Sequence, residues 1–148
     1  MKQDNIKLLK NRKADTILTP HSGEMARLTG LSIEYINENR VEIAKKYASE
    51  YGVVLLLKGY NTVITDGEKV LINPTGNSAM ASGGMGDCLT GMIASLAGQG
   101  YNRLESTFIA AYIHGLCGDE LSKTMFSVNV SELLSFLPKC MKSLLGDI

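Results

Sequence analysis

The sequence predicts an α/β domain in which a mostly parallel sheet is covered by helices on both faces. Its 148 residues, 45% of them hydrophobic and with a formal net charge of zero, suffice for one domain with a buried core. The run Val53 to Leu57 has no polar alternation, which is typical of a strand covered on both faces. A helical pattern separates it from a β-leaning run, Thr16 to Leu18, and strand, helix, strand in this order indicates a parallel crossover.

The region before the buried strand predicts one short strand and two helices. Pro20 stops the run of Thr16 to Leu18, and Ser22 then stands where the N-cap of a short helix is expected. Ser32 is expected to cap a second helix, whose apolar residues recur at steps of three and four until Gly52 ends it. This second helix is expected to lie on one face of the sheet.

The middle of the chain predicts a hairpin and a long loop. The runs Thr62 to Thr65 and Lys69 to Ile72 flank Asp66-Gly67, a dipeptide suited to a tight antiparallel turn. From Asn73 to Gly86 the chain is rich in Gly, Ser, Asn and Thr, and apolar residues then recur at helical spacing from Leu89 to Gly98. A long loop that leads into a helix is the expected functional site.

The last third of the chain is predicted to be helical. One helix is expected from about Leu104 to Leu121, and Asn129 offers the cap of a last helix that Pro138 kinks or ends. Phe126 to Val128 is a candidate short strand between them. The chain shows no linker or repeat, so residues 1–148 are expected to form a single domain.

Composition and charge exclude several classes of protein. With 15 basic and 15 acidic residues, the chain lacks the basic surplus of a nucleic-acid binder. No apolar run approaches the ~18 residues of a membrane span, and the first residues lack the apolar stretch of a secretory signal, so the cytoplasm is the expected location. Cys88, Cys117 and Cys140 have neither metal-site spacing nor disulfide density and are expected to be free thiols.

The sequence Ser82-Gly83-Gly84-Met85-Gly86-Asp87 stands directly before the predicted helix of Leu89 to Gly98. Glycines let backbone N–H groups converge on one point, and a helix N-terminus adds partial positive charge, so this segment predicts an anion hole for phosphate. Asp87 lies beside that hole and suits the role of a base that takes a proton from an attacking hydroxyl. The alternative is a glycine-rich turn in which Asp87 only stabilises the helix N-terminus.

A second candidate phosphate contact follows the buried strand. Lys58 lies at the end of Val53 to Leu57, at the sheet edge where open α/β sheets bind ligands, and its side chain is long enough to reach a phosphate. The alternative is a solvated lysine in a turn. The chain contains neither a Walker P-loop nor a dinucleotide-binding glycine motif, so those nucleotide-binding classes are excluded.

Four segments of the chain together match one family pattern. They are Thr19 to Leu28 (TPHSGEMARL), Leu57 to Thr62 (LKGYNT), Asn77 to Gly91 (NSAMASGGMGDCLTG) and Ala110 to Asp119 (AAYIHGLCGD). In this order they resemble the ADP- or ATP-dependent NAD(P)H-hydrate dehydratases, a family of the ribokinase-like superfamily. The third segment is the most specific, and chance agreement there is improbable. Ser22 replaces a usual Pro, and Met85 stands where a smaller residue is common.

The resemblance implies a three-layer ribokinase-like fold and a repair reaction, the dehydration of NADH or NADPH hydrate with ADP or ATP and Mg²⁺ as cofactors. In the family the matching Asp activates the hydroxyl of the hydrate for attack on the terminal phosphate. Asp87 is therefore the expected catalytic residue, and Asp87 and His21 are expected to bind the hydrate. The residues expected to bind the adenine nucleotide are Lys58, Gly59, Tyr60, Asn61, Thr62, Asn77, Gly83, Gly84 and Gly86.

The resemblance covers only the C-terminal half of the family's domain. Family members carry a further N-terminal portion, which supplies the opening strands of the sheet and part of the hydrate pocket. We therefore expect these strands to be missing here. The chain is either a truncated relative, or the missing half comes from another chain or from a second copy, and the unpaired strand edge favours a homo-oligomer or a partner chain. The alternative is a monomer whose sheet is closed by Phe126 to Val128 and the segment Met1 to Lys13.

Two other functions stay open. One is a small-molecule kinase of the same superfamily, of the thiazole or pyrimidine type, although Pro20-His21 followed by Gly23-Glu24 favours the dehydratases. The other is a nucleotide-binding half-domain without activity of its own. Glu24 either helps to order water around Mg²⁺ or only stabilises its own helix. His114, on an apolar helix, is interpreted as a packing residue.

Overall fold

A four-stranded sheet with the order β1-β2-β3-β4 forms the centre of the structure, a computed structural model that describes residues 5–146. β1 and β2 pair in parallel, whereas β2 with β3 and β3 with β4 pair antiparallel. The expectation of a mostly parallel sheet is therefore wrong for these residues, because the hairpin follows β2 directly and contributes two antiparallel pairings. The strands are β1 (Ile17–Leu18), β2 (Val54–Leu57), β3 (Thr62–Thr65) and β4 (Val70–Asn73).

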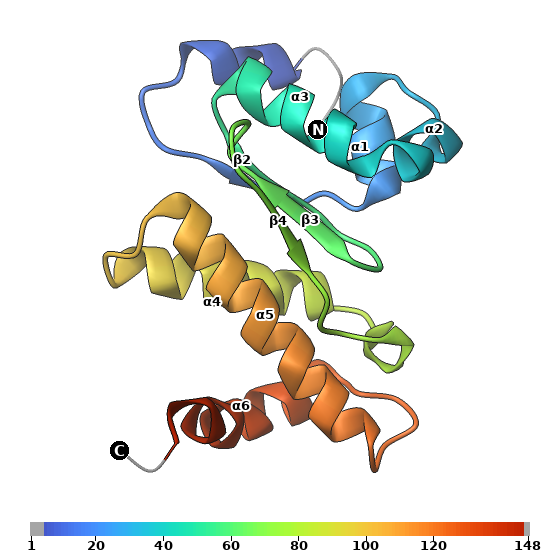
Figure 1. The fold of residues 1–148 in the computed structure, drawn as a ribbon, viewed down its shortest axis with the longest axis vertical. Helices are drawn as coiled ribbons and strands as arrows, with labels where there is room; N and C mark the ends of the chain where they lie inside the picture. Colours follow the sequence, from blue (N-terminus) through green and yellow to red (C-terminus); the bar gives the residue numbers. More distant parts are fainter. Residues whose placement is uncertain (1–4, 147–148) are drawn as a thin grey trace.

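The sheet separates two helical layers (Figure 1). One layer holds the 3₁₀ helix η1 and helices α1 to α3, and the other holds α4 and α5. Helix α6 packs against α5 on the side away from the sheet. The helices are η1 (Asn5–Asn11), α1 (Ser22–Thr29), α2 (Ile33–Glu38), α3 (Arg40–Tyr51), α4 (Met85–Gly98), α5 (Arg103–Ser122) and α6 (Val130–Leu145), with a short 3₁₀ turn η2 (Ser78–Met80).

Strand β2 is buried on both faces, as its apolar run predicts. Leu55 and Leu57 face the layer of α1 to α3, and Val54 and Leu56 face α4 and α5. All four side chains are at most 1% exposed. At roughly 25 cal/mol per Å² of buried apolar surface, such side chains are a main source of the domain's stability.

The single helix expected between Ser32 and Gly52 is two helices, which is a correction. Ser32 caps α2 as predicted, accepting from the backbone N–H of Tyr35. The break comes at Asn39, whose backbone leaves the helical region and whose side-chain amide donates to the carbonyl of Tyr35 over 2.9 Å. An Asn side chain can compete with the backbone for such carbonyls, and periodicity alone does not show this.

The hairpin forms as predicted, with a turn longer than expected. Thr65 pairs with Val70, so β4 begins one residue later than the sequence pattern indicates. Asp66 accepts from the backbone N–H groups of Glu68 and Lys69, which fixes the turn. Gly67 has φ 97°, and a Cβ there would lie 2.7 Å from the backbone of Ser49 in α3, so both the turn and the packing require glycine.

The C-terminal region confirms the predicted helices and corrects the candidate strand. Asn129 and Glu132 form a capping box at α6, and the helix continues past Pro138 to Leu145. Phe126 to Val128 form no strand, and the side chain of Phe126 is fully exposed. Residues 1–4 of the N-terminal segment expected to close the sheet lie outside the described residues, and residues 5–11 form η1 instead of a strand.

The three cysteines are free thiols, as predicted. Cys117 and Cys140 are buried and Cys88 is half-buried, all in the apolar contact between α4, α5 and α6. Burial raises the pKa of the Cys88 thiol. Within residues 5–146, none of the helices is long and apolar enough to cross a membrane.

Candidate functional site

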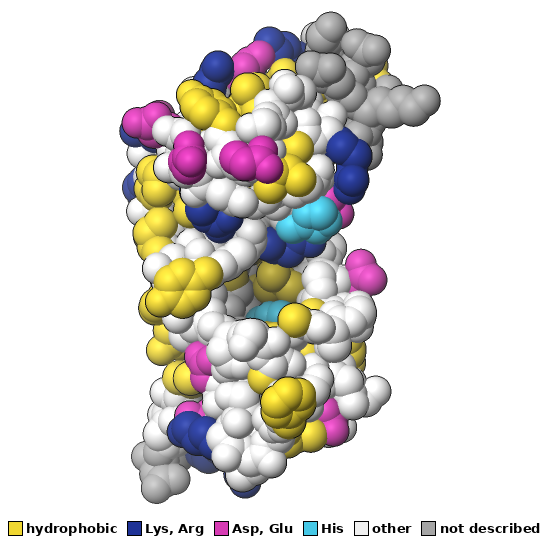
Figure 2. Space-filling model, turned by 90° about the vertical axis from the view of Figure 1, so that its right-hand side faces the viewer, with side chains coloured by type: hydrophobic (Ala, Val, Ile, Leu, Met, Phe, Trp, Pro, Cys, Tyr) yellow, Lys and Arg dark blue, Asp and Glu magenta, His cyan; other side chains and the backbone are white. Residues whose placement is uncertain are grey.

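A cavity of about 800 Å³ opens at the carboxyl ends of β1 and β2. An isolated parallel bridge between His21 and Lys58 extends the pairing of these strands and places both residues at this edge. Figure 2 shows the hollow about halfway along the molecule, with basic side chains at its rim. Its volume lies in the range of small-molecule sites. Its lining includes His21, Lys58, Gly59, Tyr60, Thr62, Asn77 and Gly86 from the predicted site, and Asn73, Thr75, Met80, Leu89, Ala111, His114 and Gly115.

Helix α4 begins at the cavity with an uncapped N-terminus. Its N-cap residue, Gly84, has φ 85°, a conformation that favours glycine, and among the described residues no side chain caps the first turn. The first N–H groups of a helix lack partners within the helix, so the N-terminus of α4 attracts anions. Gly84 and the first turn of α4 thus stand where the sequence predicts an anion hole.

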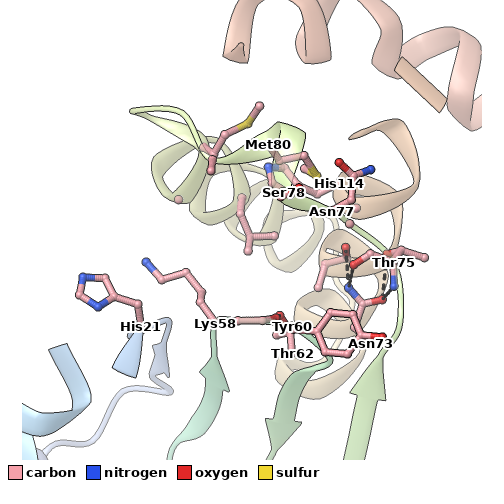
Figure 3. A pocket seen from close by; sticks show the side chains of 18 of the residues that line it. His21, Lys58, Tyr60, Thr62, Asn73, Thr75, Asn77, Ser78, Met80 and His114 are labelled. Atoms are coloured by element: carbon pink, nitrogen blue, oxygen red, sulfur yellow. Dashed lines mark hydrogen bonds between the residues drawn. The ribbon is translucent and has the colours of Figure 1, made fainter. Parts of the chain in front are cut away.

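The ammonium group of Lys58 lies over this N-terminus. A Cβ at Gly86 would lie 3.2 Å from Lys58 Nζ, so the lysine uses the space that the glycine leaves. The side chain of Lys58 comes from the end of β2 and points into the cavity (Figure 3). The two features predicted to bind phosphate therefore converge at one end of the cavity.

Glu24 holds Lys58 and the start of α1 together. Its Oε2 lies 3.5 Å from Lys58 Nζ and accepts from the backbone N–H of His21 over 2.8 Å. Partial burial raises the pKa of the Glu24 carboxyl, but the hydrogen bond from His21 and the charge of Lys58 outweigh it, so the pKa is lowered from its ordinary value. Glu24 thus completes the capping box of α1 and orients Lys58.

His21, and not Ser22, is the N-cap of α1. Its Nδ1 accepts from the backbone N–H groups of Gly23 and Glu24 over 3.0 and 3.2 Å, while the Ser22 hydroxyl donates to Asn37. Ser, Thr, Asp and Asn are the usual caps, so the sequence pattern favoured Ser22. Because Nδ1 accepts two bonds, a singly protonated ring carries its proton on Nε2, which lies at the cavity rim 3.6 Å from Glu24 Oε2.

The turn after β2 shapes the next part of the wall. Asn61 has φ 51°, and the Thr62 hydroxyl donates to the carbonyl of Gly59, which closes the turn. The side chain of Tyr60 at its tip is 87% exposed. Arg40 of α3, which the sequence analysis did not identify, donates to the carbonyl of Leu57 over 2.8 Å and braces this turn from behind.

The loop between β4 and α4 is tied to α5. Both carboxylate oxygens of Asp119 are used, Oδ2 accepting from Gly76 N over 2.9 Å and Oδ1 from the Asn77 amide over 2.7 Å. The Asn77 oxygen accepts from the backbone N–H of Ala79. The side chain of Asn77 is therefore engaged within the chain and shapes the cavity by holding the loop.

Gly115 of α5 allows the close approach of this loop. A Cβ there would lie 2.6 Å from the backbone carbon of Thr75, which is too close for any side chain. The Thr75 hydroxyl lies 3.0 Å from the carbonyl of Tyr112 on the same helix. Gly115 and Asp119 thus hold the loop between β4 and α4 against α5.

Not all predicted site residues line the cavity of the described structure. Asp87 is exposed in the first turn of α4, next to Gly86 on the wall. Gly83, Gly84 and Asn61 lie in the same loops, one or two residues from lining positions. The structure thus brings Asp87 to the entrance of the phosphate end and not to its floor.

His114 belongs to the cavity wall, which the sequence analysis did not predict. The ring is 8% exposed, and the carbonyl of Met85 is its hydrogen-bond partner. Burial lowers the pKa of His114 to about 4, although the bond to Met85 raises it. A lone histidine on an apolar helix gives no sequence signal that separates packing from ligand contact.

The described residues contain no cluster of three or more His, Cys, Asp or Glu side chains that could hold a metal ion. Three carboxylates lie next to lining residues: Asp87 follows Gly86, Glu24 contacts Lys58, and Asp119 accepts from Gly76 and Asn77. Mg²⁺ in nucleotide sites is commonly bound by one or two carboxylates together with phosphate oxygens and water. The residues present fit that kind of binding and not a metal cage formed by the protein alone.

The fold and the site define an α/β protein of the ribokinase-like class. A ribokinase-like superfamily protein of Enterococcus faecalis superposes with a TM-score of 0.76 at 31% identity, covering 95% of this chain and 50% of that one. This confirms the predicted fold class. The chain belongs to the NAD(P)H-hydrate dehydratase family, whose profile matches residues 1–139.

Individual relatives agree with this assignment. The bifunctional NAD(P)H-hydrate repair enzyme of Moorella thermoacetica is 49% identical over 136 residues, which are 89% of this chain and 26% of that enzyme. The ADP/ATP-dependent NAD(P)H-hydrate dehydratase of Bacillus subtilis, co-crystallised with ATP/Mg²⁺, superposes with a TM-score of 0.83 at 35% identity, covering 90% of this chain and 49% of that one. The chain therefore spans about a quarter to a half of the length of these relatives.

Proposed function

We propose that this chain binds ADP or ATP in the cavity and carries the nucleotide half of a site that dehydrates NADH or NADPH hydrate. The observation that carries the proposal is the convergence of the Lys58 ammonium and the uncapped N-terminus of α4 at one end of the cavity. Phosphate oxygens only accept hydrogen bonds and carry negative charge, and both groups donate and are positive. The Bacillus subtilis relative, co-crystallised with ATP/Mg²⁺, supports the same ligand.

Asp87 is the proposed catalytic base. It lies in the first turn of α4, one residue beyond Gly86 of the cavity wall. Its carboxylate would accept the proton of the hydrate hydroxyl as that oxygen attacks the terminal phosphorus and the shortened nucleotide leaves. Phosphate then leaves the ring far more readily than hydroxide does, so the ring double bond can be restored. His21 at the rim, with Nε2–H as a donor, is the proposed contact for the hydrate.

Mg²⁺ is the proposed metal, brought by the nucleotide. When bound, it would offset the negative charge of the phosphates. Of the chain's own groups, Asp87 is a candidate for direct contact, while Glu24 orients Lys58. Gly59 to Thr62 and the loop held by Asn77 would then enclose the rest of the nucleotide.

The remaining half of the hydrate pocket is proposed to come from a second copy of the chain or from another chain. In the described residues, the outer edge of β1 has no strand beside it. Unpaired edges template association between chains. The three free thiols support the cytoplasm, a reducing compartment, as the place of action.

The small-molecule kinases considered from the glycine loop alone are not favoured, because the family match is to the hydrate dehydratases. The outer edge of β1, which has no strand beside it among the described residues, supports a second candidate, a nucleotide-binding half-domain that is inactive without a partner. The two candidates share the nucleotide site and differ in whether the chain alone turns over the hydrate.

One assay tests the proposal. The purified chain is incubated with NADPH hydrate, Mg²⁺ and ADP or ATP, and recovery of the reduced nicotinamide absorbance is followed. We expect recovery, and we expect Asp87→Asn to abolish it while nucleotide affinity stays within about tenfold, because the backbone N–H groups remain. Glu68→Gln makes the same replacement of a carboxylate by an amide on the exposed hairpin turn. It is the matched control and should be fully active.

The outcomes separate the candidates. Nucleotide binding without recovery of absorbance supports the inactive half-domain. No nucleotide binding overturns both. Turnover by Asp87→Asn at the rate of the unaltered chain would assign the base to another residue.

A further inference from the structure

The ring of His114 has a nitrogen that no described residue uses. Nε2 is buried and has no hydrogen-bond partner among residues 5–146. His114 is nevertheless part of the cavity wall. Buried polar atoms nearly always have a partner, so an unpaired one at a cavity points to a ligand group that is to be bound there.

The chemistry of this nitrogen follows from its neighbours. The carbonyl of Met85 can only accept, so the ring donates to it, and because Nε2 has no partner the donor is Nδ1. The ring is neutral at pH 7 because burial lowers its pKa. A neutral imidazole has one N–H, so Nε2 presents a lone pair, and its partner must be an N–H or O–H donor.

The cavity therefore has two ends of opposite character. In Figure 3, His21 and Lys58 lie on one side of the cavity, and Asn77, Met80 and His114 lie on the other. The first end offers donors and positive charge. The wall at the second end includes the apolar side chain of Met80 and offers the acceptor of His114. The phosphates of a nucleotide, whose oxygens carry negative charge and accept hydrogen bonds, suit the first end. The nucleoside, which carries N–H and O–H donors, suits the second.

We propose that Nε2 of His114 accepts a hydrogen bond from the nucleoside part of the bound nucleotide and so sets its orientation, with the phosphates toward Lys58 and Gly86. The inference rests on the proposed nucleotide function. The donor is the exocyclic amino group of adenine or a ribose hydroxyl, which share this chemistry. In a purine with a carbonyl at the same ring position, an acceptor would face an acceptor, so the amino contact would also select the base.

Access to Nε2 requires a small movement, because the atom itself is covered. Met80, a lining side chain on the same side of the cavity as His114 in Figure 3, is the one that we expect to move. It packs where Gly118, one helical turn after His114, leaves room, and it has three rotatable bonds and neither an N–H nor an O–H. Its displacement breaks no hydrogen bond, and the new bond to His114 offsets the lost contacts.

The test is a calorimetric titration of the full chain with ADP and three analogues. Inosine diphosphate replaces the amino group with a carbonyl, and 2′-deoxy-ADP and 3′-deoxy-ADP each lack one hydroxyl. If the base donates to His114, we expect the unaltered chain to bind inosine diphosphate about tenfold more weakly than ADP. If the ribose donates, we expect the same loss for one of the two deoxy analogues instead. His114→Phe should bind ADP about tenfold more weakly and lose that preference, and His114→Gln, which keeps an acceptor, should retain part of it.

A second measurement does not depend on any variant. In the ¹⁵N-labelled chain, the Nε2 resonance should show an unprotonated nitrogen before ADP is added and should shift on saturation, while Nδ1 stays protonated. Equal losses for all four ligands in His114→Phe, together with an unshifted Nε2 resonance, would overturn the inference and leave the nucleotide function intact. No binding of ADP by the unaltered chain would overturn both.

Discussion

Replacing Gly115 with alanine tests whether the loop of the site is seated on α5 by close backbone contact. A Cβ at this position would lie 2.6 Å from the carbonyl carbon and 2.7 Å from the oxygen of Thr75. Ordinary contact needs about 0.8 Å more, and the neighbour is backbone that cannot rotate away. Overpacking of this kind costs about 1–3 kcal/mol, against a gain of up to about 1 kcal/mol from the better helix former.

We therefore expect Gly115→Ala to lower the free energy of unfolding by about 1 kcal/mol or more and to weaken ADP binding about tenfold, because Thr75 to Met80 line the cavity. Gly91→Ala is the matched control. It lies inside α4, a Cβ there would meet nothing within 4 Å, and it should stabilise the chain by about 0.5–1 kcal/mol. Urea unfolding and ADP titration measure both effects. Equal gains in stability from the two alanines, with ADP affinity unchanged, would refute the proposed packing.

Three further predictions follow from the same structure. Folding keeps the His114 ring neutral, because its pKa is about 4 in the folded chain against 6.5 ordinarily, so the unfolded chain takes up a proton first as the pH falls. The free energy of unfolding should therefore decline from pH 6.5 toward pH 4 by up to about 3 kcal/mol. Urea titrations at each pH measure this decline, and His114→Gln should lack it. Asp119→Asn should weaken ADP binding about fivefold, because the new NH₂ group would point at one of the two donors of the loop, the Gly76 N–H or the Asn77 amide. Unchanged affinity would contradict this function of Asp119. Light scattering should show a species larger than 16.0 kDa, and a monodisperse 16.0 kDa form active in the hydrate assay would show that no partner strand is needed.

The parts of the fold that sequence predicts are those set by local chemistry. The apolar run of β2, the hairpin around Asp66-Gly67 and the capping box of Asn129 with Glu132 each depend on neighbours along the chain, and each is confirmed. The start of α4 was predictable for the same reason, because a glycine loop before a helix has a known local geometry, while its binding of phosphate stays a prediction.

Other features of the site depend on contacts that local sequence patterns do not show. The Asn77 amide, whose binding of nucleotide stays a prediction, donates to Asp119, 42 residues away, and Arg40 donates to the carbonyl at the end of β2 from 17 residues away. The unpaired Nε2 of His114 exists only because the helices pack as they do. His21 and not Ser22 caps α1, because the Glu24 carboxylate three residues further on accepts from the His21 N–H and the bridge to Lys58 holds the His21 backbone at the sheet edge.

The central claim, that the cavity is a nucleotide site, is tested most directly by calorimetric titration of the purified chain with ADP and ATP in the presence of Mg²⁺. We expect saturable binding with one site per chain, weakened about tenfold or more in Lys58→Ala and unchanged in Lys69→Ala, an exposed lysine of the hairpin turn. The absence of binding heat with both nucleotides, or equal affinity in the two lysine variants, would contradict the account.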